Sequence, residues 1–204
     1  MVVAPNGSSL SSTVQNQEKA SAAFYDGFLI RHKKQMPCSC KLPLEIYPDS
    51  AEWGPLLWTI LHGIAERSGA AVTPLFRADE RRQLVSLFHA VAKMIPCPSC
   101  KEHYTEYLKE HPVDKTLKDI PYEEIRPYVR RWFWELHNWV NESYGKPVFS
   151  LEDVATTYRS VAIRTVMKQL AAPMQRAIRL QAGQLFGYNE FVKSVTMLLS
   201  LYGV

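Results

Sequence analysis

Apolar residues recur at intervals of three and four positions along most of this sequence, and that spacing limits the chain to α-helices. Such intervals place side chains on one face of a helix. No segment shows the strict alternation that is typical of a half-buried strand. The stripes that carry the pattern are Leu57, Ile60, Leu61 and Ile64; Leu84, Leu87, Phe88, Val91 and Ile95; and Val129, Trp132, Leu136 and Val140. The sequence therefore predicts an all-α fold, a helical bundle with short connections.

Prolines, glycine and polar residues mark the expected helix ends. Asp79 is the expected N-cap of the second helix, and Pro96 and Pro98 separate that helix from a third over residues 99–110. Residues 111–121 are expected to form a loop.

A long helix is then expected to end near Tyr144, because Gly145 suits the C-cap and Pro147 follows it. Residues 151–170 and a last helix that ends near residue 201 complete the predicted bundle. The last helix carries an apolar stripe that must be buried, either on its own core or against a partner chain. The stripe is Phe191, Val195, Leu198 and Leu199.

Composition excludes several classes of protein. The 204 residues are 47% hydrophobic and 22% charged, as in a soluble globular protein. A net charge of +4, with acidic and basic residues interleaved, is too small to indicate nucleic-acid binding. No apolar run is long enough for a membrane span, and the N-terminus lacks the features of a secretory signal. A cytosolic or nuclear location is expected, where stable structural disulfides are rare.

The four cysteines form two close pairs, Cys38 with Cys40 and Cys97 with Cys100. Buried, inert thiols are one interpretation, but two tight pairs flanked by prolines disfavour it. A second interpretation is a structural zinc site formed by all four cysteines. However, Cys38 and Cys40 are separated by a single residue, which is poor spacing for a zinc knuckle. The third is a redox pair, because Cys97 and Cys100 lie where a helix begins and its dipole lowers a thiol pKa.

Two helix faces combine aromatic and polar residues, which is unusual for a small bundle. Trp58 and His62 share one face, since they are four residues apart. Trp134, His137, Asn138 and Asn141 share another. Inward polar groups need partners, which a single core histidine could find within the protein. Two such faces favour a bound heteroaromatic ligand that a redox cysteine pair could reduce.

These motifs together resemble the Erv/ALR family of FAD-linked sulfhydryl oxidases. The shared order is W-G-P-x-x-W-x-x-L-H, then P-C-x-x-C, then W-x-x-x-x-H-N-x-V-N-x-x-x-G-K-P. The compact core is most similar to forms from large DNA viruses. The resemblance implies a four-helix core with a short fifth helix that cradles FAD, here with an additional C-terminal helical extension.

The resemblance also implies roles for individual residues. Cys97 and Cys100 match the catalytic redox pair, and Cys38 and Cys40 match the position of an outlying shuttle pair. Many relatives carry a second disulfide at the positions of Trp134 and Leu151, which is missing here. The residues that match FAD-binding positions are Gly54, Trp58, His62, His137, Asn138, Val140, Asn141, Lys146, Phe149 and Tyr158.

Composition, apolar spacing and the resemblance together divide the chain into four expected parts. Residues 1–36 are expected to be a disordered tail with a short helix, and residues 37–52 a cysteine-containing arm. Residues 53–158 correspond to the Erv/ALR-like domain, and residues 159–204 to a helical C-terminal extension.

The expected function is an FAD-dependent thiol oxidase that generates disulfides in substrate proteins. Electrons would pass from Cys97 and Cys100 through FAD to O₂, with H₂O₂ as the product. The expected partners are thiol-containing substrate proteins or a thioredoxin-like carrier, and the chain is expected to form a homodimer. The expected location is the cytoplasm. If the source is viral, the location would be cytoplasmic assembly sites or the virion. The alternative is a non-enzymatic interaction module, stabilised by zinc bound to Cys38, Cys40, Cys97 and Cys100. The colour of the purified protein distinguishes the oxidase from this module, since a flavoprotein is yellow and a zinc protein is colourless.

Overall fold

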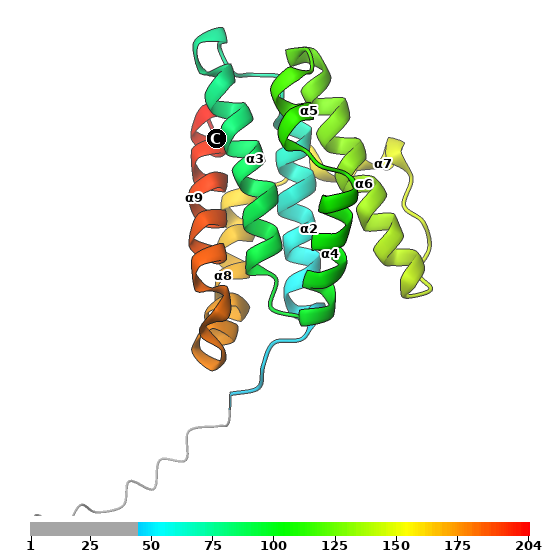
Figure 1. The fold of residues 1–204 in the computed structure, drawn as a ribbon, viewed down its shortest axis with the longest axis vertical. Coiled ribbons are helices and arrows are strands. Elements are labelled where there is room, and N and C mark those ends of the chain that lie inside the picture. Colours follow the sequence, from blue (N-terminus) through cyan, green and yellow to red (C-terminus); the bar gives the residue numbers. More distant parts are fainter. Residues whose placement is uncertain (1–44) are drawn as a thin grey trace, which may run out of the picture. The chain divides into compact units, whose positions relative to one another are not determined.

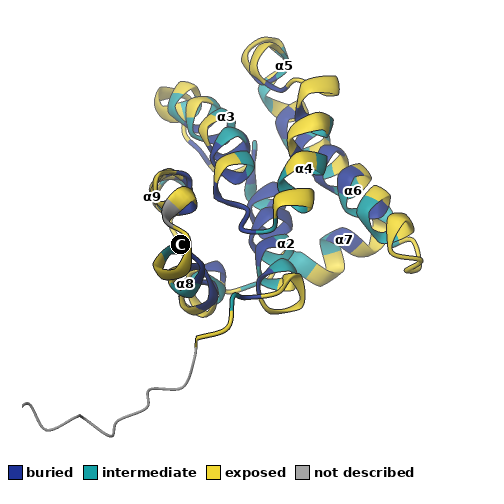
Figure 2. Cartoon of the chain, turned by 60° about the horizontal axis from the view of Figure 1, so that its bottom comes forward, coloured by how far each residue is buried: buried dark blue, intermediate teal, exposed yellow. Residues whose placement is uncertain are grey.

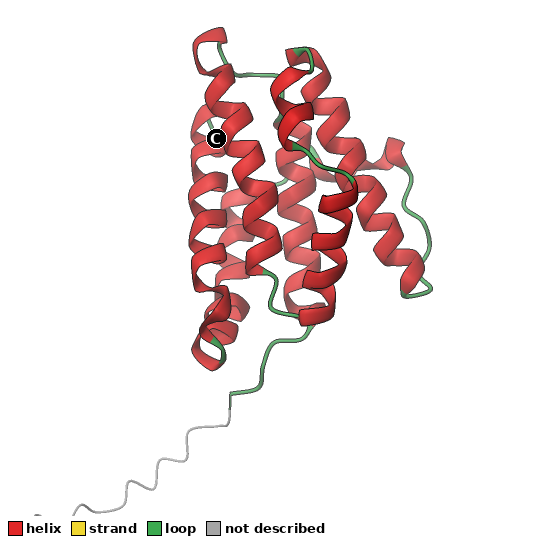
Figure 3. Cartoon of the chain, in the orientation of Figure 1, coloured by secondary structure: helices red, strands yellow, loops and turns green. Residues whose placement is uncertain are grey.

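The computed structural model describes residues 45–204, and in this part of the chain helices joined by loops are present without a strand (Figure 3). The predicted all-α bundle is confirmed. The predicted tail, the short N-terminal helix, and the part of the arm that contains Cys38 and Cys40 lie outside the described residues. Within residues 45–204, no helix is both long and apolar enough to cross a membrane.

Four long helices and two short ones form the first part of this bundle, and two further long helices complete it (Figure 1). The helix α2 lies at the centre, with α6 and α7 on one side and α8 on another, while α9 packs along α3. The bounds are α2 Ser50–Arg67, α3 Arg77–Met94, α4 Pro98–Glu110, α5 Asp114–Asp119, α6 Ile125–Ser143, α7 Leu151–Tyr158, α8 Ile163–Leu180 and α9 Leu185–Leu201.

The helix α2 begins at a capping box. The Asp49 carboxylate accepts hydrogen bonds from the backbone N–H groups of Ala51 and Glu52. The Glu52 carboxylate accepts one from the N–H of Asp49 in return. This reciprocal pair satisfies N–H groups that a helix end leaves free. The arm predicted over residues 37–52 therefore already includes the start of α2.

Other predicted boundaries also differ from the structure. Asp79 is not the N-cap of α3, because the 3₁₀ turn Pro74–Phe76 leads directly into a helix that starts at Arg77. The predicted loop over residues 111–121 contains α5. The predicted helix over residues 151–170 is interrupted between α7 and α8.

The C-terminal extension packs onto its own chain. The predicted apolar stripe of α9 faces α3, and Phe191, Val195, Leu198 and Leu199 are all buried there. Figure 2 shows buried positions on the faces by which α2, α3, α8 and α9 approach one another. The stripe therefore joins the main hydrophobic core and needs no partner chain to cover it.

Gly187 allows α9 to approach α3 closely, and its replacement by alanine is expected to destabilise the protein. A Cβ atom there would lie 2.6 Å from the backbone carbonyl carbon and the Cβ of Lys93 and from the backbone nitrogen of Met94. Overpacking of this kind costs about 1–3 kcal/mol of unfolding free energy. Urea unfolding of Gly187→Ala should show this loss.

Gly54 in α2 provides the matched control, because no neighbouring atom lies within 4 Å of the point that an alanine Cβ would occupy there. Since Gly54 lines the expected cofactor pocket, the comparison uses flavin-free protein, in which Gly54→Ala should gain up to about 1 kcal/mol from helix propensity. Equal effects of the two substitutions would contradict the close contact at Gly187.

Candidate active site

A disulfide joins Cys97 to Cys100 at the start of α4, with the two Cα atoms 5.2 Å apart. Cys97 is the N-cap residue, and Pro98 occupies the first helical position, one residue earlier than predicted. The backbone N–H of Cys100 donates a hydrogen bond to the Cys97 sulfur at 3.2 Å. The positive end of the α4 dipole thus lies at the two sulfurs, where it stabilises a thiolate.

The two cysteines have different surroundings. Cys100 lines a pocket between the helices, whereas Cys97 does not. The Cys97 sulfur lies 3.3 Å from the hydroxyl of the exposed residue Ser99. An incoming thiol can therefore approach Cys97 from outside, while Cys100 faces whatever occupies the pocket.

The pocket has a volume of about 300 Å³ and is lined mainly by apolar and aromatic side chains. This is the lower end of the range for small-molecule sites. Helices α2, α3, α4, α6 and α7 all contribute to its wall. The predicted cofactor residues that line it are Gly54, Trp58, His137, Val140, Asn141, Lys146 and Tyr158.

A stack of aromatic rings joins α2, α6 and α7 at this pocket. Trp58 stacks on His137, with ring centroids 4.2 Å apart and planes 8° apart. His62 is fully buried, and its Nε2 lies 3.0 Å from Nδ1 of His137. The ring of Tyr158 stacks on His62 with the centroids 4.7 Å apart. His62 therefore acts behind the pocket wall, where it fixes the position of His137.

Both imidazoles are neutral at physiological pH. Burial, and then the nearby His137, lowers the pKa of His62 from 6.5 to about 3. Burial, and then the charge of Lys146, lowers the pKa of His137 from 6.5 to about 4. In the neutral pair, one ring nitrogen donates the shared hydrogen bond and the other accepts it.

This arrangement predicts that the protein loses stability in mild acid. The unfolded chain binds protons at both histidines as the pH falls through 6.5, whereas the folded chain binds them only near 4 and 3. The free energy of unfolding should therefore fall from pH 6.5 toward 4, by up to about 1.4 kcal/mol per pH unit for each histidine. Urea unfolding at a series of pH values measures this slope, and His62→Gln should reduce it. An unchanged slope in that variant would contradict the buried pair.

Asn138 and Phe149 do not line the pocket, although both were predicted to bind the cofactor. The Asn138 amide nitrogen donates to the Phe149 carbonyl oxygen at 2.9 Å, and its amide oxygen accepts from the Phe149 N–H at 2.9 Å. Trp134 Nε1 donates to the same carbonyl oxygen at 2.6 Å. These three hydrogen bonds join α6 to the segment before α7, near the position where a second disulfide was expected in relatives.

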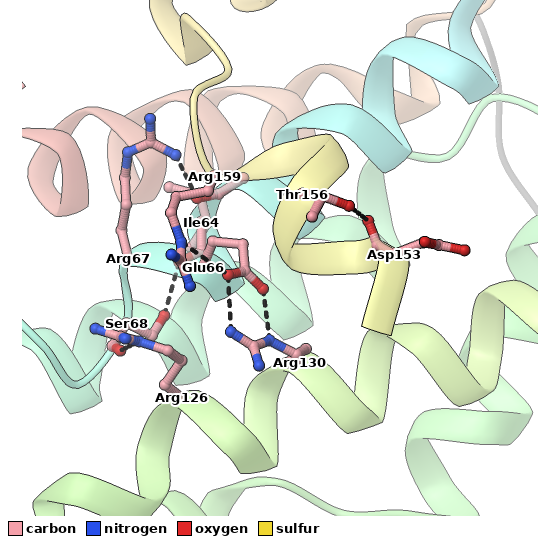
Figure 4. Close-up of polar contacts among 10 residues, drawn as sticks. Ile64, Glu66, Arg67, Ser68, Arg126, Arg130, Asp153, Thr156 and Arg159 are labelled. Carbon is pink, nitrogen blue, oxygen red and sulfur yellow. Dashed lines mark hydrogen bonds and ion pairs between the residues drawn. The ribbon is translucent and has the colours of Figure 1, made fainter. Parts of the chain in front are cut away.

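A buried ion pair fixes the helices that carry the aromatic stack (Figure 4). The Glu66 carboxylate is buried one turn beyond His62, and the Arg130 guanidinium binds it at 2.5 and 2.7 Å. Arg159, next to Tyr158, lies 4.0 Å from the same carboxylate. The network therefore joins α2 and α6 to the end of α7.

Trp53, His103 and Tyr104 also line the pocket but were not predicted as site residues. The indole Nε1 of Trp53 is buried and has no hydrogen-bond partner within the described residues. The spacing of Trp53 relative to Leu57 could have revealed Trp53, because residues four apart share one face of α2 and Leu57 also lines the pocket. Tyr104 was harder to predict, since its hydroxyl bonds to the Phe88 carbonyl and its burial resembles that of a core residue.

Comparison with known proteins identifies the family. Residues 55–159, more than half of the 204, match the model of the Erv1/Alr family. The chain belongs to the Erv1/Alr family. The predicted family is therefore confirmed, whereas the expected closer likeness to viral forms stays a prediction. The matched region of this Erv1/Alr protein contains the redox pair and all the cofactor residues predicted from the sequence except Gly54, which lies just before it.

The FAD-linked sulfhydryl oxidase ERV1 of Oryza sativa subsp. japonica is 32% identical over 103 residues, which are 50% of this chain and 47% of that protein. The mitochondrial FAD-linked sulfhydryl oxidase erv1 of Schizosaccharomyces pombe is 30% identical over 105 residues, 52% of each chain. A putative FAD-linked sulfhydryl oxidase, 096R, of Invertebrate iridescent virus 3 is 25% identical over 111 residues, 54% of this chain and 68% of the viral one. The match spans about half the length of the first two relatives. No solved structure matches the chain significantly.

Proposed function

We propose that this protein is an FAD-dependent thiol oxidase that forms disulfides in thiol-containing proteins. Electrons would leave the Cys97–Cys100 pair for FAD and then O₂, with H₂O₂ as the product. The observation that carries the proposal is that the two cysteines of the disulfide have different surroundings: Cys100 lines an aromatic pocket, and Cys97 lies outside it. The names of the relatives support the same activity.

The residues of the pocket fit a flavin nucleotide. Trp53 and Trp58 supply flat apolar surface, and the unpartnered Nε1 of Trp53 is a buried donor that a ligand acceptor would satisfy. Lys146 supplies a cation at the wall, as a phosphate group requires. When bound, FAD would accept two electrons from a thiolate and return them to O₂.

The chain's own residues have distinct tasks in this proposal. A substrate thiolate attacks the Cys97 sulfur, and Cys100 leaves as a thiolate that the start of α4 stabilises. A second substrate thiol then releases Cys97, so that the substrate gains one disulfide. His137, kept neutral by burial and by the charge of Lys146, is hydrogen-bonded to His62 and stacked on Trp58, so it keeps the pocket wall rigid and uncharged.

Cys38 and Cys40 are proposed as a shuttle between protein substrates, or a thioredoxin-like carrier, and Cys97. Replacing both by serine should preserve oxidation of a small dithiol and abolish oxidation of a protein dithiol. Equal losses on both substrates, or none on either, would remove the shuttle role.

Flavin content tests the proposed cofactor. The purified protein should be yellow, and denaturation should release one FAD per chain. A flat visible spectrum together with bound zinc would instead support the interaction module. Within residues 45–204, no group of three or more potential metal ligands occurs, so a zinc site would need Cys38 and Cys40 from outside that range.

A homodimer remains a proposal, but it must use a surface other than the apolar stripe of α9. That stripe is buried against α3 within one chain. Light scattering on the full chain tests the proposal, and a monomer at all concentrations would rule it out.

A further inference from the structure

Two hydrogen-bond donors at the start of α4 point at the Cys97 sulfur. The backbone N–H of Cys100 donates to this sulfur at 3.2 Å, and the Ser99 hydroxyl lies 3.3 Å from it. Because the Cys97 sulfur carries no proton in the disulfide, the hydroxyl is the donor of the second hydrogen bond. Both hydrogen bonds thus end at the outward-facing sulfur rather than at the sulfur of Cys100.

The Ser99 hydroxyl supplies a donor at a turn where the backbone has few. Cys97 is the N-cap residue, and Pro98 occupies the first helical position. Proline has no backbone N–H, so this residue gives the sulfur no hydrogen bond. Ser99 occupies the next position, and its side chain reaches back to Cys97. Cys97 is partly exposed and Ser99 is exposed, so the hydroxyl lies where an incoming thiol would arrive.

Cys97 carries a negative charge at one step of the proposed oxidation, when the finished substrate disulfide is released. The second thiolate of the substrate attacks the mixed disulfide, and Cys97 leaves as a thiolate. A thiol leaves faster when its pKa is lower, and a donor to the thiolate lowers that pKa. The Ser99 hydroxyl is placed to give this stabilisation.

We propose that Ser99 is a catalytic residue that stabilises the Cys97 thiolate as the substrate disulfide is released. This inference rests on the proposed thiol oxidase function. The Ser99 hydroxyl keeps its proton and donates only a hydrogen bond. It would act on the release of Cys97 more than on the first attack, in which Cys100 is the leaving group.

The release step is balanced between the substrate and Cys97. The bond between the two substrate sulfurs forms as the bond between Cys97 and the substrate breaks. The electron pair of the broken bond stays on the Cys97 sulfur, and the proton of the second substrate thiol passes to solvent. Over both exchange steps the substrate loses two electrons, and the Cys97–Cys100 pair gains them.

The pKa of the Cys97 thiol measures the stabilisation without a flavin signal or a substrate protein. The full chain with Cys38→Ser, Cys40→Ser and Cys100→Ala keeps Cys97 as its only thiol. Alanine is chosen at position 100 because serine would place a second hydroxyl near Cys97, whereas the backbone N–H is retained. The rate of alkylation by iodoacetamide over a series of pH values, followed by mass spectrometry, gives the pKa.

In this background, Ser99→Ala should lower the acid dissociation constant of the Cys97 thiol roughly threefold to tenfold. The direction follows from the loss of a donor to the charged form, which raises the thiol pKa. The effect stays moderate because Ser99 is exposed, so water replaces part of the lost hydrogen bond.

Two control variants separate the hydroxyl from other effects of substitution. Ser99→Thr keeps a hydroxyl at the same position and should stay within about twofold of the parent constant. Thr105→Ala removes another hydroxyl of α4, which donates to the Lys101 carbonyl oxygen at 2.7 Å, and should also stay within about twofold. The ionisable side chains on the elements that form the turn are the same in every variant: Tyr47, Lys93, Lys101, Glu102 and His103.

The chain with all four native cysteines provides a second measurement that does not depend on the folding of the triple variant. The protein is equilibrated with reduced and oxidised glutathione at mildly alkaline pH, and the intact Cys97–Cys100 disulfide is quantified in an unreduced digest. Ser99→Ala should favour the disulfide roughly twofold to tenfold over the dithiol, because the reduced form loses a donor to the Cys97 thiolate. Thr105→Ala should not shift this equilibrium.

Three results would overturn the proposal: an unchanged Cys97 pKa in Ser99→Ala, an equal rise in Thr105→Ala, or a rise in Ser99→Thr as large as that in Ser99→Ala. None of these depends on FAD. Failure of the oxidase proposal would appear separately, as missing flavin or missing oxidation of a small dithiol.

Discussion

Replacing Cys100 by serine is expected to abolish dithiol-dependent oxygen consumption while FAD stays bound. Cys100 is the member of the pair that lines the aromatic pocket, so its sulfur is the one that can pass electrons to a ligand there. A serine hydroxyl fills a similar volume but cannot form the disulfide. Because the residue forms and breaks a covalent bond in the reaction, the loss should reach roughly three orders of magnitude or more.

Cys97→Ser should be equally inactive, for a different reason. It removes the outward sulfur that substrate thiols attack but leaves the Cys100 thiol at the pocket. A thiolate beside bound FAD should then give a broad long-wavelength absorption band, which Cys100→Ser should lack. An oxygen electrode and a visible spectrum of each variant provide both measurements. Activity that persists in both variants, or the same band in both, would contradict the assigned roles.

Removing Arg130 is expected to cause the largest loss of stability among single substitutions in the network around Glu66. The Glu66 side chain is completely buried, and Arg130 provides its two short hydrogen bonds. Arg159 is mostly exposed and lies 4.0 Å away, so it compensates poorly. An unpaired buried carboxylate costs about 3–5 kcal/mol, and Arg130→Ala should lower the melting temperature by roughly 6–12 °C.

Two further variants separate the buried charge from general disruption. Glu66→Leu with Arg130→Met replaces both charges by apolar groups and should recover most of the lost stability. Glu190→Gln breaks an exposed ion pair with Lys93 and should cost less than about 1 kcal/mol. A double variant as unstable as Arg130→Ala would contradict the argument. Since Glu66 lies one turn from His62, flavin retention should fall together with stability in Arg130→Ala.

Apolar periodicity predicted the long helices, because their burial depends on residues three and four positions apart. The short helix α5 was missed because its stability comes from elsewhere in the fold. Leu117 is buried, and Arg81 of α3 donates to the carbonyl oxygens of Leu117 and Ile120 at the end of α5. A contact between positions so far apart in the sequence leaves no local pattern to read.

The candidate site was predictable where a motif residue faces the pocket and not where its neighbour turns away. His137 and Asn138 are adjacent in α6, so their side chains point about 100° apart. His137 stacks on Trp58, whereas Asn138 bonds to the backbone of Phe149. The sequence placed both in the H-N motif but could not show that one lines the pocket and the other fixes the segment beside it.

The apolar stripe of α9 shows a different limit. Its spacing predicted that Phe191 and Leu198 would be buried, and they are. A stripe does not show whether its own chain or a second copy covers it. The deciding feature is Gly187, which allows α9 to lie against the backbone of α3.

Anaerobic addition of a dithiol to the purified protein tests the central claim most directly. The visible flavin band should bleach with wild-type protein and return when air is admitted. In Cys100→Ser the same band should be present and should not bleach. A protein without the band, or a band that bleaches equally well without Cys100, would contradict an electron path from Cys97 and Cys100 to FAD.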